Sequence, residues 1–233
     1  MSPPAGGAML HQRSLNRRIA AAVDRHPLPI LVGCALLIQV FGRYHAHHFT
    51  VGPFYYSWII LRILLPICLL LLLKVPLSRL ALERPCRDRF LTAVAALSLL
   101  ALGGIYFVIR FSPEYGAYYA DRFGPADRRL LRFMIFTLST LTGWEFFHRG
   151  FLLQGLRFFL EKKHALSAST AAGTALAFVW VFEVLFHLIK PGMEALGMWL
   201  ASPLLCLITI RSGSIWPAFV IHLAVEAVFI LSI

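Results

Sequence analysis

Long apolar stretches alternate with short basic segments along this chain, and the alternation predicts its architecture. A helix needs about 20 apolar residues to cross a bilayer, and several stretches reach or approach that length. We expect spans at residues 28–42, 54–73, 91–109, 130 to about 157–163, 165–188, 193–210 and 215–233. The pattern therefore predicts an all-α fold, a polytopic transmembrane helix bundle of about seven spans with a range of six to eight.

The composition agrees with a membrane protein. Hydrophobic residues make up 59% of the 233 residues and charged residues 14%, whereas soluble domains contain about 45–50% apolar residues. The formal net charge is +11 at pH 7, but the basic residues are concentrated between the apolar stretches. This distribution is typical of cytoplasmic loops that face anionic lipids, so we expect the lipid bilayer as a partner and no nucleic acid. The four cysteines form no Cys-x-x-Cys pair, which argues against a disulfide or a zinc site built on sulfur.

The chain is predicted to have two regions. Residues 1–26 form a basic N-terminal cytoplasmic segment, and residues 27–233 form a single transmembrane domain. With the N-terminus in the cytoplasm, seven spans place the most basic segments, 1–26, 74–89 and 157–163, on the cytoplasmic side. The first span follows no secretory cleavage site, so we expect it to remain as an anchor.

Two polar features of the N-terminal half have more than one interpretation. Arg62 lies inside the second apolar stretch, where it either pairs with an acidic group of the bundle or extends its charge to the membrane surface. His45, His47 and His48 follow the first stretch. This cluster is more typical of an exposed polar loop than of a metal site.

Ionisable side chains recur inside three of the later apolar stretches. They are Glu145, His148, Arg149, Glu183, His187, His222 and Glu226. Within each stretch these residues are spaced so that they share one helix face. Charged groups at membrane depth are costly and normally face a protein interior or a water-filled cavity. We therefore expect the three segments to line one polar, functional cavity.

Such a set of side chains can activate water. A carboxylate takes the proton, while an imidazole orients the water or donates to the leaving group. The same residue types can instead ligate a divalent metal such as zinc, and the candidate ligands are His187, His222 and Glu226. The His-Glu-x-x-His signature of common metalloproteases does not occur. Arg149 is interpreted as the ion-pair partner of Glu145.

Three short motifs follow one another in this half of the chain. They read Trp-Glu-Phe-Phe-His-Arg at 144–149, Glu-Val-Leu-Phe-His at 183–187 and His-Leu-Ala-Val-Glu at 222–226. In order and spacing they resemble the Glu-Glu-x-x-x-Arg, Phe-x-x-x-His and His-x-x-x-Asn motifs of the CPBP family (CAAX protease and bacteriocin-processing, or Abi) of intramembrane proteases. The resemblance covers residues 130–230.

The chain departs from the family pattern at three positions. Trp144 stands in place of the first, catalytic Glu, Glu183 in place of the Phe, and Glu226 in place of the Asn. In the family, the first Glu and the first His are thought to activate water, while the last His and the Asn steady the oxyanion, which an ionised Glu226 would repel. Three interpretations stay open: Glu145 is the base, Glu226 or Glu183 replaces the lost carboxylate, or the site is inactive.

The resemblance implies a protease of the bacterial inner (plasma) membrane that hydrolyses a membrane-associated peptide or protein near or within the membrane. The expected roles are base or base-orienting acid for Glu145, its partner for Arg149, water positioning for His187, and intermediate stabilisation for His222 with Glu226. Glu183 and His148 are candidate accessory residues, and the alternative for His148 is that it simply lies at the cytoplasmic interface. The alternatives are an inactive membrane scaffold or immunity protein, a protein whose two motif histidines ligate haem, and a proton-coupled transporter, which the lack of a repeat disfavours.

Overall fold

The computed structural model describes residues 21–45, 56–86, 89–111, 117, 120, 128–188 and 192–231. The regular secondary structure of these residues is helical, without a strand. The predicted polar cluster at His47 and His48 and most of the N-terminal segment lie outside the described residues.

Helices occur at all of the places where spans are predicted. The N-terminal half contains α2 (Pro27–His45), a continuous helix made of α3 (Tyr56–Ile59), η2 (Ile60–Leu64) and α4 (Leu65–Leu72), the short turn η3 (Leu77–Leu80) and α5 (Arg89–Phe111). A second continuous helix contains α7 (Arg129–Phe136), η5 (Thr137–Leu141), α8 (Thr142–Glu145), η6 (Phe146–Leu153) and α9 (Gln154–His164). It is followed by α10 (Ala168–His187), α11 (Gly192–Ser212) and α12 (Trp216–Leu231). The all-α prediction is confirmed.

The segments η2, η5 and η6 are π-helical. A π-helical turn is wider than an α-helical turn, is rare, and occurs frequently at functional sites. The segments η5 and η6 flank α8, which carries Trp144 and Glu145, and η6 itself carries His148 and Arg149. The predicted charged face therefore lies where the long helix departs from regular α geometry.

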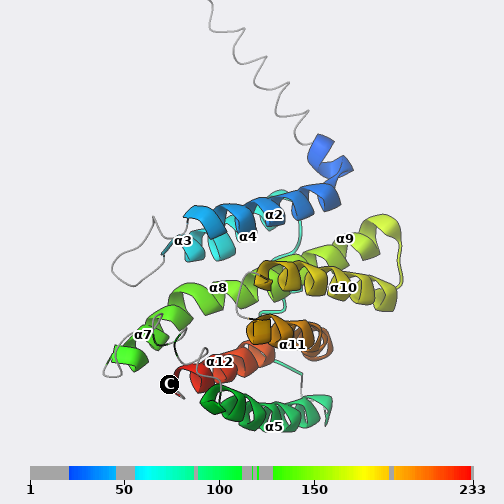
Figure 1. Ribbon diagram of the computed structural model, residues 1–233. Helices are drawn as coiled ribbons and strands as arrows, with labels where there is room; N and C mark the ends of the chain where they lie inside the picture. Colours follow the sequence, from blue (N-terminus) through cyan, green and yellow to red (C-terminus); the bar gives the residue numbers. More distant parts are fainter. Residues whose placement is uncertain are drawn as a thin grey trace, which may run out of the picture.

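The helices form a stack whose centre is η6 (Figure 1). In this view α2 lies beside α3 and α4 at the top, the α7–α9 helix crosses the middle beside α10, and α12 and α5 form the lowest pair. Helix α10 packs against α9 and α11, and α12 packs against α11 and α5. The segment η6 contacts α2, η2, α4, α10 and α11, so its side chains reach both halves of the chain.

Packing around η6 buries all of its residues. Phe147, Phe151 and Leu152 belong to the same buried cluster as Leu31 of α2 and Leu70 of α4, and all five side chains are fully buried. A tightly packed interior holds side chains in single rotamers. The polar residues of η6 are therefore held in place by tightly packed apolar side chains.

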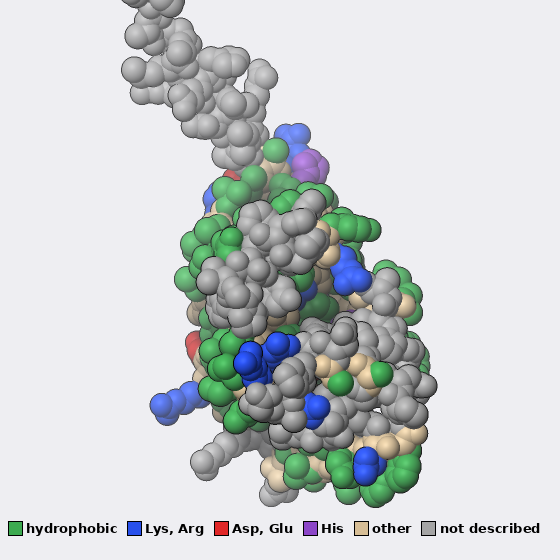
Figure 2. All heavy atoms as spheres, turned by 60° about the vertical axis from the view of Figure 1, so that its left-hand side comes forward, with side chains coloured by type: hydrophobic (Ala, Val, Ile, Leu, Met, Phe, Trp, Pro, Cys, Tyr) green, Lys and Arg blue, Asp and Glu red, His purple; other side chains and the backbone are tan. Residues whose placement is uncertain are grey.

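The outer faces of the helices are apolar, as expected for contact with lipid. The large hydrophobic side chains Leu37, Leu100 and Phe111 are 70%, 74% and 76% exposed, and hydrophobic side chains cover much of the described surface in Figure 2. By length and hydropathy, Pro27–Tyr44, Ala168–His187 and Ala195–Ser212 can each cross a membrane. Shorter apolar helices cover Tyr56–Leu72, Thr92–Gly104 and Trp216–Val228. The chain is an integral membrane protein.

Polar contacts gather three distant segments at one end of the bundle. Lys74 Nζ, after α4, donates to Asp24 Oδ1 at 2.8 Å, and Lys163 Nζ, at the end of α9, donates to the Asp24 carbonyl at 2.8 Å. The hydrogen bond from Lys74 holds the pKa of Asp24 below its ordinary value. The three most basic segments were predicted to share one side of the membrane, and these contacts bring residues of 1–26, 74–89 and 157–163 together. That this side is cytoplasmic stays a prediction.

A second set of contacts ties the segment after η3 to the turn between α11 and α12. The Ile215 amide donates to the Ala81 carbonyl at 2.8 Å, and Ser214 Oγ donates to the Glu83 carbonyl at 2.7 Å. The Cys86 amide donates to the Ser212 carbonyl at 2.9 Å. The two halves of the chain are therefore joined by backbone hydrogen bonds as well as by packing.

Candidate active site

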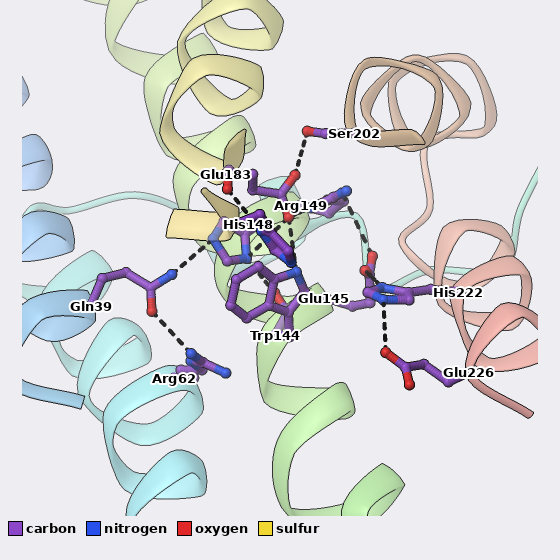
Figure 3. Close-up of polar contacts among 11 residues, drawn as sticks. Gln39, Arg62, Trp144, Glu145, His148, Arg149, Glu183, Ser202, His222 and Glu226 are labelled. Carbon is purple, nitrogen blue, oxygen red and sulfur yellow. Dashed lines mark hydrogen bonds and ion pairs between the residues drawn. The ribbon is translucent and has the colours of Figure 1, made fainter. Parts of the chain in front are cut away.

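Polar side chains from both halves of the chain meet around α8 and η6 (Figure 3). Gln39 of α2 and Arg62 of η2 approach from one side, and His222 and Glu226 of α12 from the other, while Glu183 of α10 and Ser202 of α11 lie beside η6. Sequence motifs far apart in the chain are thus brought together around one helical segment. The close contacts divide into three groups linked through Trp144, His148 and Arg149.

The first group is centred on Glu183, which accepts hydrogen bonds from three side chains. Its Oε1 accepts from Arg149 Nη1 at 2.5 Å and from Trp144 Nε1 at 2.9 Å, and its Oε2 accepts from Ser202 Oγ at 2.5 Å. Glu183, Arg149 and Ser202 are fully buried. A buried carboxylate is stable when it is paired and hydrogen-bonded, and these donors leave neither oxygen of Glu183 without a partner.

The second group contains Glu145, His222 and Glu226. Glu145 Oε1 accepts from His222 Nδ1 at 2.6 Å, and the other ring nitrogen of His222, Nε2, lies 3.9 Å from Glu226 Oε1. The Glu145 side chain is only 1% exposed, whereas those of His222 and Glu226 are 11% and 12% exposed. Within this group the Glu145 carboxylate is therefore buried, whereas the side chains of His222 and Glu226 are partly accessible.

Arg149 connects these two groups. Its Nη1 bonds to Glu183, and its Nε lies 3.6 Å from Glu145 Oε2. The predicted pair with Glu145 is thus present as an ion pair, but the closer partner is Glu183. Glu145 Oε2 and two nitrogens of Arg149, Nε and Nη2, are buried and make no hydrogen bond. Buried polar atoms of this kind are commonly satisfied by an ordered water.

His187 lies on the other side of α8 from His222. Its Nδ1 is 2.8 Å from the Glu183 carbonyl, and its ring meets that of Trp144 edge to face at a centroid distance of 5.0 Å. Trp144 and Glu145 are neighbours in the chain, and they point to α10 and α12 respectively. The two motif histidines therefore approach the same helical turn from different directions, and an indole faces His187 where the family pattern has a carboxylate.

The third group comes from the N-terminal half and corrects two interpretations. Arg62 is 4% exposed, so it does not extend to the membrane surface. Its guanidinium carbon lies 3.5 Å from the Trp58 ring centroid and 4.6 Å from that of Trp144, and its Nη2 donates to Gln39 Oε1 at 3.1 Å. Within the described part of the chain no carboxylate lies at ion-pair distance from Arg62. Aromatic rings and an amide, rather than an acid, accommodate this charge.

His148, for which a position at the cytoplasmic interface was one interpretation, lies inside the helix bundle. The side chain is fully buried because η6 is packed on several sides. Its Nε2 lies 3.2 Å from Gln39 Nε2, its Nδ1 lies 2.9 Å from the Trp144 carbonyl, and Nδ1 is also 3.5 Å from Glu183 Oε1. His148 therefore links α2 to the Glu183 group.

Sequence reasoning missed Gln39, Trp58 and Ser202. Each lies inside an apolar stretch, and an amide or hydroxyl in such a stretch often bonds to a neighbouring helix. That signal was present for Gln39 and Ser202. Nothing in the spacing of Trp58 and Arg62 predicts that the Arg62 guanidinium also reaches Trp144.

Among the residues that the structure describes, no three His, Cys, Asp or Glu side chains form a group that could hold a metal ion. The proposed ligands do not fit a metal as a set, because His187 and His222 lie on different sides of α8 and Glu145 is bonded to His222.

Comparison with known families agrees with the motifs. Residues 126–228 match the family model described as type II CAAX prenyl endopeptidase Rce1-like. This match confirms the predicted resemblance over the segment that carries α7 to α12, and it is a resemblance to a family of CAAX-type proteases. Neither the curated proteins nor the solved structures contain a significant match. Gln39 and Arg62 lie outside the matched segment.

Proposed function

We propose that this chain, similar over residues 126–228 to the type II CAAX prenyl endopeptidases, is an intramembrane endopeptidase in which Glu145 and His222 activate water. The observation that carries the proposal is the 2.6 Å contact between His222 Nδ1 and Glu145 Oε1. A buried carboxylate that accepts from one ring nitrogen fixes the tautomer and the orientation of an imidazole, and it stabilises the imidazolium form. The other ring nitrogen, Nε2, then serves as the base.

In this mechanism Glu226 holds the attacking water together with His222. The separation of 3.9 Å between Nε2 and Glu226 Oε1 is too long for a direct hydrogen bond, and a single water could bond to both atoms. The partial exposure of both side chains supports access for water. The side chain of Glu226, where the family motif has Asn, then accepts a hydrogen bond from the second proton of that water.

The hydrolysis proceeds in two proton transfers. His222 Nε2 takes a proton from the water as the water oxygen bonds to the peptide carbonyl carbon. The C–N bond of the tetrahedral intermediate then breaks, and the Nε2 proton passes to the departing amine, which leaves a carboxylic acid and an amine as products. Arg149, whose Nε lies 3.6 Å from Glu145 Oε2, stays beside that carboxylate, and His187 positions the peptide or a second water from the α10 side.

A specific observation favours a second candidate, a catalytically inactive membrane scaffold or immunity protein. The indole of Trp144 meets His187 at 5.0 Å and donates to Glu183. A non-ionisable ring thus fills the place at which the resemblance puts the catalytic carboxylate. If both His187 and a carboxylate beside it are required for turnover, this arrangement abolishes it while the fold is retained.

Cleavage of a pooled library of membrane peptides by detergent-purified protein tests the proposal. The variants are Glu145→Gln, His222→Gln, Glu226→Gln and His187→Ala, each assayed with and without a chelator. The enzyme predicts that His222→Gln abolishes cleavage, that Glu145→Gln lowers kcat by about 10²–10⁴-fold, and that a chelator has no effect. Chelator-sensitive cleavage would assign the water activation to a metal instead.

Matched controls come from α9. Glu161→Gln and His164→Ala change a carboxylate and an imidazole away from the site, and both variants should cleave like the wild type. The inactive scaffold predicts that a cellular phenotype of the deleted protein is restored equally by the wild type, Glu145→Gln and His222→Gln. Restoration by the wild type alone rejects the scaffold.

A further inference from the structure

We infer that Gln39 and Arg62, both in the half of the chain that the family model does not cover, are positioning residues of the site: they fix the indole of Trp144 and the protonation of His148. This inference deepens the proposed function and rests on it for its catalytic consequence. The structural claim, that Gln39 and Arg62 fix Trp144 and His148, rests only on the contacts between these residues.

The donors and acceptors of this group fix its proton positions. A guanidinium only donates, so the Gln39 atom 3.1 Å from Arg62 Nη2 is the amide oxygen, Oε1. The amide NH2 of Gln39 then faces His148 Nε2 at 3.2 Å, and this ring nitrogen must accept. The proton of His148 therefore resides on Nδ1, which donates to the Trp144 carbonyl at 2.9 Å. His148 is a neutral imidazole with both nitrogens engaged.

Arg62 also holds the indole itself. Its guanidinium lies between the rings of Trp58 and Trp144, with centroid distances of 3.5 and 4.6 Å. Gly143 permits this approach of η2 to α8, because a Cβ at position 143 would lie 3.1 Å from Arg62 Cβ and 3.3 Å from the Trp58 carbonyl. A planar cation packed against an indole restricts its rotation in a way that the point charge of a lysine cannot.

The indole of Trp144, held by Arg62, contacts other residues of the site. Trp144 Nε1 donates to Glu183 at 2.9 Å, its ring packs tilted against that of His148 at a centroid distance of 4.2 Å, and it meets the ring of His187 edge to face at 5.0 Å. Glu183 in turn is the close partner of Arg149, whose Nε faces Glu145. Loss of Arg62 or Gln39 is thus expected to disturb residues that neither of them contacts.

The chain provides a matched control pair for this test. Arg157 Nη1 donates to Gln154 Oε1 at 3.1 Å, the same kind of contact and the same distance as between Arg62 and Gln39. The Arg157–Gln154 pair contains none of the contacts to Trp144 or His148 described above. The test therefore compares Arg62→Lys and Gln39→Met with Arg157→Lys and Gln154→Met in the full-length protein.

The readout is nuclear magnetic resonance of protein labelled with 15N in tryptophan and histidine. The indole N–H signal of Trp144 is assigned with Trp144→Phe, and the ring nitrogens of His148 with His148→Gln. We expect Arg62→Lys to move the indole signal of Trp144, and Gln39→Met to shift the His148 Nε2 signal towards that of a nitrogen without a hydrogen bond. The two control variants should leave both signals in place.

Unmoved Trp144 and His148 signals in both site variants would overturn the inference. If Arg62→Lys does not fold, Gln39→Met decides alone, since it removes an amide without changing charge. Where cleavage is measurable, the kcat of Arg62→Lys and of Gln39→Met should be about tenfold lower than that of the wild type, with KM changed by less than about twofold. If the Trp144 and His148 signals move in the variants but the wild-type protein cleaves no peptide, the positioning role is retained and the proposed function is rejected. If the wild-type protein cleaves peptides but the signals do not move, the proposed function is retained and the positioning role is rejected.

Discussion

The indole of Trp144 donates to Glu183 across 2.9 Å, so two of the positions at which the chain departs from the CPBP motifs are in direct contact. Relative to those motifs, the chain has an aromatic ring in place of a carboxylate on one helix and a carboxylate in place of an aromatic ring on the facing helix. The new carboxylate is not isolated, because Arg149 and Ser202 also donate to it. The two departures are best understood as one coupled change.

This coupling predicts a non-additive pair of substitutions. Trp144→Phe removes one hydrogen bond to Glu183 and should cost about 1 kcal/mol of unfolding free energy. Glu183→Gln leaves Arg149 without its closest carboxylate and should cost about 3–5 kcal/mol. The double variant should lose less than the sum, as measured by denaturation in detergent. Trp180→Phe is the control, since Trp180 Nε1 donates to the Trp199 carbonyl instead, and its effect should add to that of Glu183→Gln.

Arg149 is predicted to tolerate no replacement by lysine. Its Nη1 reaches Glu183 while its Nε faces Glu145, and a single ammonium cannot serve two carboxylates on different sides. Arg149→Lys should therefore destabilise the protein by about 3 kcal/mol or more and lower the yield of folded protein. Arg157→Lys, at a partly exposed pair with Glu161, should change stability by less than about 0.5 kcal/mol. Equal stability of these two variants would contradict the bridging role of Arg149.

Two glycine substitutions should have opposite signs. Gly143→Ala places a Cβ 3.1 Å from Arg62 Cβ and 3.3 Å from the Trp58 carbonyl, and such overpacking costs about 1–3 kcal/mol. Gly173 lies within α10 with no atom within 4 Å of the added Cβ. Gly173→Ala should therefore stabilise the protein by up to about 1 kcal/mol through helix propensity. Thermal unfolding in detergent measures both, and stabilisation by Gly143→Ala would refute the close approach of η2 and α8.

The contact between Asp24 and Lys74 should make stability depend on pH at the membrane surface. The pKa of Asp24 is lowered in the folded protein by the hydrogen bond from Lys74. The stabilising contribution is therefore fully present above the ordinary carboxyl pKa and is lost as the pH falls through the lowered one. Asp24→Asn should lower the melting temperature slightly at neutral pH and leave it unchanged in strong acid, and high salt should reduce the difference. A difference that persists at low pH would contradict this assignment.

Hydropathy was sufficient to predict the helices, because a bilayer leaves few alternatives to a helix that satisfies its own backbone. The i,i+4 spacing also predicted that Glu145 and Arg149 interact, and the ion pair at 3.6 Å agrees. Helix boundaries followed from the same pattern, since turns such as that at Gly213, where φ is +65°, separate the apolar stretches.

The contacts between helices could not be predicted in the same way. The spacing of residues within one helix does not show which neighbouring helix they face. The contacts of Arg149 with Glu183 and of His222 with Glu145 could therefore not be predicted. The burial of His148 depends on how η6 packs and on its contact with Gln39 of α2, and neither is contained in the motif spacing. The contribution of Arg62 required knowledge of how η2 packs, which a single sequence does not contain.

The packing of α5 has a consequence for the order of assembly. Its described contacts are chiefly with α12, although Arg89–Phe111 precedes Trp216–Leu231 by more than a hundred residues. Synthesis proceeds from the N-terminus, and helices that have inserted into the bilayer associate in a separate step. Helix α5 thus enters the membrane long before its partner exists, and lipid tails occupy the face around Val94 in the interval. Docking of α12 displaces those lipids, so this face of α5 is covered by protein only after α12 has been made.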